Sequence, residues 1–337
     1  MSKIVSNWRL FGAAALLLAT IVLAGGATAE VDARWKREFP KADFSKHSVD
    51  LGEIFSGGPP RDGIPAIDKP AFVTAKEAAS KGLPDREAVI AVAINGDVRA
   101  YPLRILMWHE IVNDTVGGVP VAVTFCPLCN SAVVFDRRLD GVTLDFGTTG
   151  RLRNSDLVMY DRQTESWWQQ FLGEAIVGTL TGKRLKILPV RVESFAKFKA
   201  RAATGKKVLV PNDPSARRYG HNPYARYDSR SRPYAFFRGK MPTGIAPLER
   251  VVVVGKQAWA LSLIKAKKKI VSGDLVITWE SGQASALDTT VIARGKDVGN
   301  VAVQRRSNKG LVDAVHDISF AFAFHAFHPK GKIHTLN

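Results

Sequence analysis

One stretch decides the fold: Val119-Pro-Val-Ala-Val-Thr-Phe-Cys-Pro-Leu-Cys-Asn-Ser-Ala-Val-Val-Phe-Asp136, the only part of the 337-residue chain that contains cysteine. The apolar, β-branched run Val119–Phe125 is typical of a buried strand. Residues Ser131–Asp136 predict a second strand, so Cys126 and Cys129 lie where one strand passes into the next. We therefore expect the chemistry of this protein at the turn between these strands.

Short strand and turn signals continue on both sides of this stretch. Asn95-Gly96, between two apolar runs, is the strongest two-residue hairpin signal in the chain. Short helices are expected at Thr74–Lys81 and at Leu103–Val112, and the second of these contains His109. Residues 147–155 are polar and bounded by glycine, which predicts a loop. The pattern indicates a β-rich α+β protein with short helices.

The first 29 residues are typical of a secretory signal peptide. Lys3 and Arg9 provide the positive leader, Leu10–Leu23 the apolar core and Ala27-Thr-Ala29 a small-residue cleavage site. The alternative is an uncleaved N-terminal anchor. No later run approaches the roughly 20 apolar residues that span a bilayer. We expect a periplasmic or secreted protein that is soluble after signal cleavage.

The chain is strongly basic, with 48 Lys and Arg against 31 Asp and Glu and a formal net charge of +17. Such a charge suits nucleic acid, an anionic envelope surface or acidic substrates. Export argues against nucleic acid, and the basic residues are scattered, which favours a solvated basic surface. The expected partner is an unidentified small molecule, a metal ion or an envelope component.

Composition divides the exported chain into four parts. Residues 30–60 are polar and mixed and predict an N-terminal arm, and residues 61–210 form a β-rich domain that carries the two cysteines. Residues 211–244 are rich in tyrosine, arginine and proline. They suit either a polyanion-binding segment or an ordered connecting loop with tyrosines as packing anchors, and we favour the loop. Residues 245–337 complete the chain.

The last part of the chain, residues 245–337, resembles a degenerate copy of the cysteine-bearing domain. Its segment Ile277–Ala286 aligns without gaps on Val123–Ala132, so that Glu280 takes the place of Cys126. Other elements match in the same order, which favours internal duplication. We therefore expect two tandem related β-rich units, and we expect Ile277–Thr290 to superpose on Val123–Asp136 as strand, turn and strand. The second unit has lost the thiols.

Several long motifs resemble those of one protein family. They are Ala100-Tyr-Pro-Leu-Arg-Ile-Leu106, Trp108-His-Glu-Ile-Val-Asn-Asp-Thr-Val-Gly-Gly118, Phe125-Cys-Pro-Leu-Cys-Asn130, Asn154-Ser-Asp-Leu-Val-Met-Tyr-Asp161 and Leu180-Thr-Gly182. The resemblance covers roughly Ile64 to Tyr227 and is to exported bacterial and archaeal proteins catalogued as domain of unknown function 3179. It implies no known activity, cofactor or substrate. Asn130 departs from the pattern, because a small residue, often glycine, is expected there.

Cys126-Pro-Leu-Cys129 has the spacing of a redox pair, in which one thiol reacts and the other resolves the mixed disulfide. Cys126 is the expected reactive member, exposed to solvent and stabilised as thiolate. A turn and another strand follow the motif, whereas the thioredoxin-like motif opens a long helix. Asn130 stands where haem attachment needs histidine, which excludes a c-type haem.

The same two cysteines also suit a metal site. Thiolates select copper(I) and zinc, and His109 with an aspartate would complete the ligands. Alternatively, His109 acts as the base that holds Cys126 as thiolate. The remaining interpretation is an inert structural disulfide in an oxidising compartment.

A polar segment downstream of the cysteines is the expected ligand-binding wall. Its chosen residues are Arg151, Asn154, Ser155, Tyr160, Asp161 and Trp168, with Asp156 in the same cluster. The alternative is a turn network that caps strand ends.

Three functions stay open at this point. The first is a thiol-based site, either redox-active or metal-binding. The second is a non-catalytic envelope or ligand-binding module that uses residues 211–244 and keeps the cysteines as a structural disulfide. The third is a hydrolase based on Asp161 or Glu110, which no paired-carboxylate or nucleophile motif supports.

Overall fold

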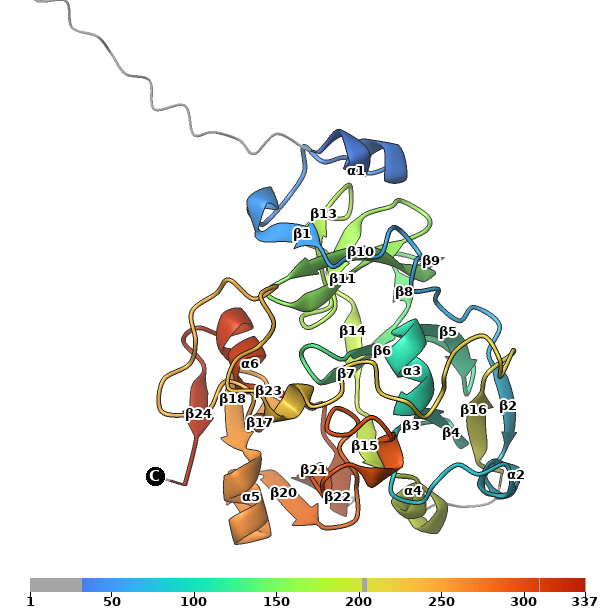
Figure 1. Cartoon of the computed structure of the whole chain (residues 1–337), viewed down its shortest axis with the longest axis vertical. Coiled ribbons are helices and arrows are strands. Elements are labelled where there is room, and N and C mark those ends of the chain that lie inside the picture. Colours follow the sequence, from blue (N-terminus) through green and yellow to red (C-terminus); the bar gives the residue numbers. More distant parts are fainter. Residues whose placement is uncertain (1–31, 202–204, 309, 337) are drawn as a thin grey trace, which may run out of the picture. The chain divides into compact units, whose positions relative to one another are not determined.

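Short strands dominate the computed structural model, which describes residues 32–201, 205–308 and 310–336 (Figure 1). The α-helices are α1 (Ala33–Glu38), α2 (Ala75–Ser80), α3 (Leu103–His109), α4 (Phe195–Arg201), α5 (Leu261–Lys267) and α6 (Ala321–Phe327). Single 3-10 turns are η1 (Leu51–Glu53), η2 (Tyr227–Ser229) and η3 (Ile292–Arg294). The expected signal peptide, residues 1–29, lies outside the described residues. None of the helices described has the length and apolar character needed to cross a membrane.

The first sheet is built on the expected Asn95-Gly96 hairpin. From one edge to the other it contains β15 (Arg191–Ser194), β3 (Ala88–Ile94), β4 (Asp97–Pro102), β16 (Lys207–Val210) and β2 (Ala71–Thr74). Asn95 and Gly96 have φ angles of 49° and 81°, the left-handed values that a tight hairpin turn of this kind requires. The predicted hairpin is confirmed.

The second sheet contains the cysteine stretch. Its strands, in order, are β14 (Lys186–Leu188), β7 (Ser131–Asp136), β6 (Val119–Cys126) and β5 (Ile111–Val116). Strands β6 and β7 pair antiparallel up to Cys126 and Ser131, so the predicted strands on either side of the thiols are confirmed. All of β7 and most of β6 are buried, as their apolar sequence requires.

The expected helix Leu103–Val112 is too long by three residues. Helix α3 ends at His109, and Glu110 has a φ of 57°, a left-handed conformation that turns the chain directly into β5. A glutamate in this conformation is uncommon, and the sequence carries no glycine or asparagine that would signal it.

The expected polar loop at residues 147–155 is a strand in the structure. It belongs to a third sheet of β1 (Ile54–Ser56), β10 (Phe146–Arg153), β11 (Asp156–Asp161), β12 (Trp167–Gln169) and β13 (Glu174–Val177). Thr148 and Thr149 are buried and donate hydrogen bonds to backbone carbonyls, so their polarity does not indicate exposure. Only Asn154 and Ser155, with φ angles of 54° and 63°, form a turn.

The remaining strands form two sheets and a two-stranded ribbon. One sheet is β23 (Asp317–Phe320), β17 (Arg250–Val254), β18 (Gln257–Ala260) and β24 (Lys332–His334), and the other is β19 (Lys269–Ser272), β20 (Leu275–Glu280), β21 (Asn300–Ser307) and β22 (Gly310–Asp313). The ribbon is β8 (Arg138–Leu139) with β9 (Val142–Thr143). In the described part of the chain there are thus five sheets of four or five strands.

The strands of the last two sheets are connected like those of the first two. We call β2–β7 and β14–β16 the first set and β17–β24 the second set, which is orange and red in Figure 1. In each set a hairpin leads to a short helix, a residue with φ near 60° and a second hairpin. The outer strands also match. In the first set β15 pairs antiparallel with β3 and β16 pairs parallel with β4, and in the second set β23 and β24 pair in the same directions with β17 and β18.

The two sets differ in structure after β6 and β20, the strands that the sequence alignment pairs. The β6–β7 turn is short, whereas residues 281–299 separate β20 from β21. The strand expected directly after Ile277–Glu280 is therefore wrong, although β20 itself ends at Glu280 as β6 ends at Cys126. Residues 281–299 lie between the two sets, where Ala284 N–H donates to Arg86 O over 2.8 Å.

The second set packs on the cysteine turn. Phe320 N–H donates to the carbonyl of Cys129 over 2.9 Å, and the Asn130 side-chain amide donates to Ile318 O over 2.7 Å. The half-buried carboxylate of Asp317 accepts hydrogen bonds from the first residues of β7. Strand β23 therefore holds the turn in a single conformation.

Asn130 should contribute to stability in two separable ways, through its φ of 52° and through its amide bond to Ile318. Asn130→Ala loses both and should lower the free energy of unfolding by about 2–3 kcal/mol. Asn130→Gly keeps the left-handed backbone and should cost only about 1 kcal/mol. Urea denaturation measures both values. An alanine variant as stable as the parent would show that neither feature matters.

Candidate functional site

The two cysteines lie at the end of β6 and in the turn that follows. They are 3.9 Å apart and free, not joined in a disulfide. Their side chains are only 2% and 0% exposed. The structural-disulfide alternative therefore does not describe this structure. The expectation of a solvent-exposed Cys126 is wrong as well, because β6 is an interior strand.

Asp156, the first residue of β11, brings a third group to the thiols. One of its carboxylate oxygens and both sulfur atoms lie within 4.8 Å of one another. Its Oδ2 accepts hydrogen bonds from Gln169 Nε2 over 2.6 Å and from Phe171 N–H over 2.9 Å. Its Oδ1 is buried and has no hydrogen-bond partner among the described residues. Such an unpaired buried oxygen is energetically costly.

Glu110 is a second buried carboxyl group near the thiols. It is 8% exposed, and burial, with a contribution from the charge of Asp156, raises its pKa to about 8. Burial also raises the pKa of Asp156 to about 7, although the hydrogen bonds from Gln169 and Phe171 oppose this rise. Burial of both carboxyls disfavours their charged forms.

The thiols are held in the protonated form by the same surroundings. Burial raises the pKa of Cys126, and the charges of Asp156 and Glu110 add to the rise. Burial raises the pKa of Cys129 well above its usual value, with Cys126 and Asp156 adding to it. A redox nucleophile needs the opposite shift, toward thiolate at neutral pH.

Tyrosines from residues 211–244 cover the site. Tyr227 is completely buried and donates a hydrogen bond to the carbonyl of Leu128, between the two cysteines, over 3.0 Å. Its ring stacks on Tyr234 at 4.5 Å. The pKa of Tyr224 is raised by burial and by the neighbouring Glu110 and Cys126. This segment thus separates the thiols from solvent.

His109 does not belong to the group formed by the thiols and Asp156. Its Nδ1 bonds the carbonyl of Pro65 and its Nε2 bonds the hydroxyl of Tyr219, each over 2.8 Å. The helix ends at His109, and the reversal at the next residue directs Glu110 toward the thiols instead.

Among the residues expected in the ligand-binding wall, Ser155 contacts a thiol. Cys126 Sγ donates a hydrogen bond to its carbonyl over 3.7 Å, and the buried Ser155 hydroxyl has no partner among the described residues. Asn154 forms the turn before Asp156. These two residues position the start of β11 beside the cysteines.

The other four wall residues bind protein groups. Arg151 pairs with Glu38 of the N-terminal arm. Tyr160 donates its hydroxyl hydrogen to Asp62 over 2.5 Å. Asp161 accepts a hydrogen bond from the Trp168 indole over 2.9 Å. These contacts attach the arm and tie the strands of the third sheet together, and they place no polar group at the thiols.

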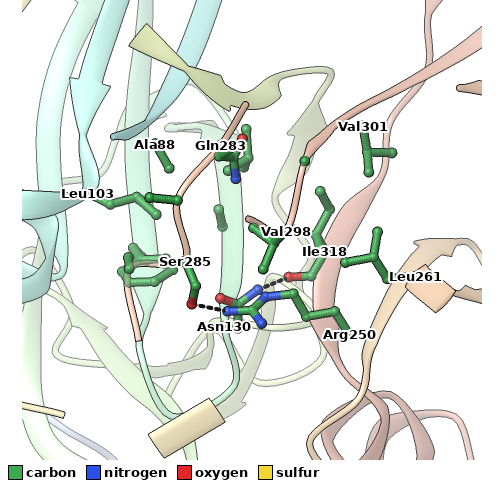
Figure 2. Close-up of a pocket in the computed structure, with 16 residues that line it drawn as sticks. Ala88, Leu103, Asn130, Arg250, Leu261, Gln283, Ser285, Val298, Val301 and Ile318 are labelled. Carbon is green, nitrogen blue, oxygen red and sulfur yellow. Dashed lines mark hydrogen bonds between the residues drawn. The ribbon is translucent and has the colours of Figure 1, made fainter. Parts of the chain in front are cut away.

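A small cavity of about 20 Å³ lies on the other side of the cysteine turn (Figure 2). Asn130 and Arg250 both line it, and Arg250 donates to Ser285 Oγ over 2.7 Å. The nearby Gln283 Oε1 is buried without a partner among the described residues. The space suits about one water molecule, so it is not a substrate pocket.

Sequence reasoning considered Asp156 and Glu110 without assigning them to the thiols. Asp156 stood only in the polar cluster, and Glu110 only in the hydrolase hypothesis. The sequence does carry a signal for both residues. Asp156 stands directly before the apolar run that begins at Leu157, and Glu110 stands directly before the one that begins at Ile111. Acidic residues at such positions are seldom buried without a reason.

The buried thiols should react slowly with alkylating agents. In metal-free folded protein, iodoacetamide should modify them on the order of a hundredfold more slowly than in urea-unfolded protein. Because the pKa of Cys126 is raised, its rate should still increase above about pH 9.5, where an ordinary thiol with a pKa of about 8.5 is almost fully ionised and its rate levels off. Mass spectrometry over time measures both rates. Equal rates in folded and unfolded protein would contradict the burial.

Comparison with known proteins adds a family but no function. Searches found no match among curated proteins and none among solved structures. A family model described as "Protein of unknown function (DUF3179)" matches residues 61–331, which include Cys126, Cys129 and Asp156. This match covers most of the sequence, and the chain therefore belongs to the DUF3179 family.

Proposed function

We propose that Cys126, Cys129 and Asp156 bind one metal ion in an exported protein. The observation that carries the proposal is the unpaired Oδ1 of Asp156, buried in a group whose ligand atoms lie within 4.8 Å of one another. A cation between these atoms would satisfy the oxygen. It would also stabilise both thiolates, which burial alone disfavours.

The donor set favours zinc over copper(I). Two sulfurs suit either ion, but a carboxylate oxygen is a common ligand of zinc and a poor one for the softer copper(I). Three protein ligands leave a fourth position for a bound molecule, and Glu110, which lies outside the group of three but close enough for its charge to affect Cys126, would act on that molecule. This arrangement resembles catalytic zinc sites more than closed structural ones.

Export remains part of the proposal and rests on the leader-like residues 1–29. Free vicinal thiols are readily oxidised in an oxidising compartment. Burial and metal coordination both protect them. The raised pKa values of Cys126 and Cys129 count against a thiol–disulfide exchange function.

We also infer that the two sets are copies and that only the first kept a site. Phe125 N–H donates to Glu110 O over 2.8 Å, and Trp279 N–H donates to Lys268 O over 2.9 Å, so the two strands have the same register. Glu280 then stands in place of the first cysteine. Lys268, in place of Glu110, lies over the Trp279 ring at 3.9 Å. One metal ion per chain follows.

Metal analysis tests this proposal. Metal-free protein that is incubated with zinc and then desalted should retain one zinc ion per chain. Inductively coupled plasma mass spectrometry measures the retained metal. Cys126→Ser and Cys129→Ser should each abolish retention, and Asp156→Asn should weaken binding by at least about tenfold. Asp161→Asn, at the other end of the same strand, is the matched control and should retain zinc.

The outcomes separate the alternatives. Retention of copper(I) but not zinc would show that the metal is copper, with the three proposed ligands unchanged. A parent protein that retains neither ion, or a Cys126→Ser variant that retains as much as the parent, would overturn the proposal. Circular dichroism on each variant shows that it is folded.

Metal binding should also stabilise the fold, because the ligands come together only in the native state. With free zinc at about 100 times its dissociation constant, the free energy of unfolding should rise by about 2.7 kcal/mol. Thermal melting with and without zinc measures this, and a chelator should reverse it. The Asp156→Asn variant should show a smaller increase at the same zinc concentration.

A further inference from the structure

Two strand edges are covered in the first set by one segment of the chain, Ile67–Thr74. Ile67 pairs with Val112 of β5 as a single parallel bridge, and strand β2 at the other end of the segment covers the edge of β16. At the bridge, Ile67 N–H donates to Ile111 O and Asn113 N–H donates to Ile67 O, each over 2.9 Å.

The same two edges are open in the second set. Strands β19 and β24 correspond to β5 and β16, and each is the outermost strand of its sheet. No described residue pairs with their outer sides. By the shared register, Lys269 O and Val271 N correspond to the two groups of β5 that bond Ile67. Val271 is 48% exposed.

A groove of about 610 Å³ includes residues of both open edges. Its lining includes Lys267, Lys269 and Lys332, and contains no acidic residue among those described. None of these three lysines forms an ion pair within the described part of the chain. Leu263, Ile270 and the exposed Val271 supply an apolar surface. The groove therefore combines unpaired backbone, apolar area and uncompensated positive charge.

We propose that this groove binds an extended acidic peptide segment of a partner protein. The segment adds to β19 as a parallel strand through Lys269 O and Val271 N, and continues antiparallel along β24, as Ile67–Thr74 does in the first set. Backbone pairing at a sheet edge is a common mode of peptide recognition. Alternating carboxylates on the segment meet the groove lysines, whereas a second copy of this chain would bring lysines together.

The test uses fluorescence polarisation with a labelled eight-residue peptide of alternating valine and glutamate. The matched probe replaces glutamate with lysine. The acidic peptide should bind the full chain at least about tenfold more tightly than the basic one. On binding, hydrogen exchange should slow at the Val271 amide.

Two variants separate backbone pairing from general charge attraction. Lys269→Glu should weaken binding of the acidic peptide by about tenfold, whereas Lys76→Glu, the same change on the exposed face of α2, should not. Val271→Pro removes one outward N–H without changing charge. Proline is tolerated at an edge strand, so this variant should fold and still lose binding.

Three results would overturn the proposal. One is no binding of the acidic peptide at about millimolar concentration, since backbone pairing tolerates many sequences. Another is unchanged affinity in Val271→Pro. The third is a concentration-dependent dimer in sedimentation that Lys269→Glu alters, which would make a second copy the occupant.

Discussion

The site depends on one backbone hydrogen bond, donated by Phe125 N–H to the carbonyl of Glu110 over 2.8 Å. It joins the end of α3 to the end of β6, so that the left-handed Glu110 and the first cysteine lie together. The second set repeats this bond with Trp279 and Lys268. The scaffold thus exists twice, and the difference in chemistry comes from the side chains placed on it.

The carboxylate that lies beside the two thiols comes from outside the repeated scaffold. In the second set, β21 leads directly to β22, whereas in the first set the β8–β9 ribbon and strands β10–β13 of the third sheet are inserted between β7 and β14. Asp156 begins β11 in that inserted sheet. The replacement of Glu110 and of both cysteines, together with this insertion, therefore distinguishes the set that carries the cysteine site from the set that does not. The N-terminal arm stabilises the insertion, since Arg151 pairs with Glu38 and the Tyr160 ring packs against Phe39 of the arm.

Apolar runs and turn residues predicted the strands and hairpins whose residues are close together in the sequence. The strands around Cys126 and the Asn95-Gly96 hairpin follow from apolar runs and a two-residue turn, and both are correct. The register of Ile277–Glu280 on the cysteine strand follows from alignment within the chain. The helix end at Glu110 was missed, because no glycine marks its backbone conformation. The meeting of Asp156 with the thiols was missed because it depends on how an inserted sheet packs, which neither periodicity nor spacing reports.

The tyrosine-rich segment that covers the thiols has a kinetic consequence. Residues 211–244 connect the two sets, and Tyr227 closes the site by bonding the carbonyl between the cysteines. If Cys126, Cys129 and Asp156 bind an ion as proposed, that ion would leave only when this segment opens. Its residence time is then governed by the rate at which the segment opens. In the proposed site, the same closure would make an ion easiest to load before the second set has docked, so that the order of folding would decide which ion is retained.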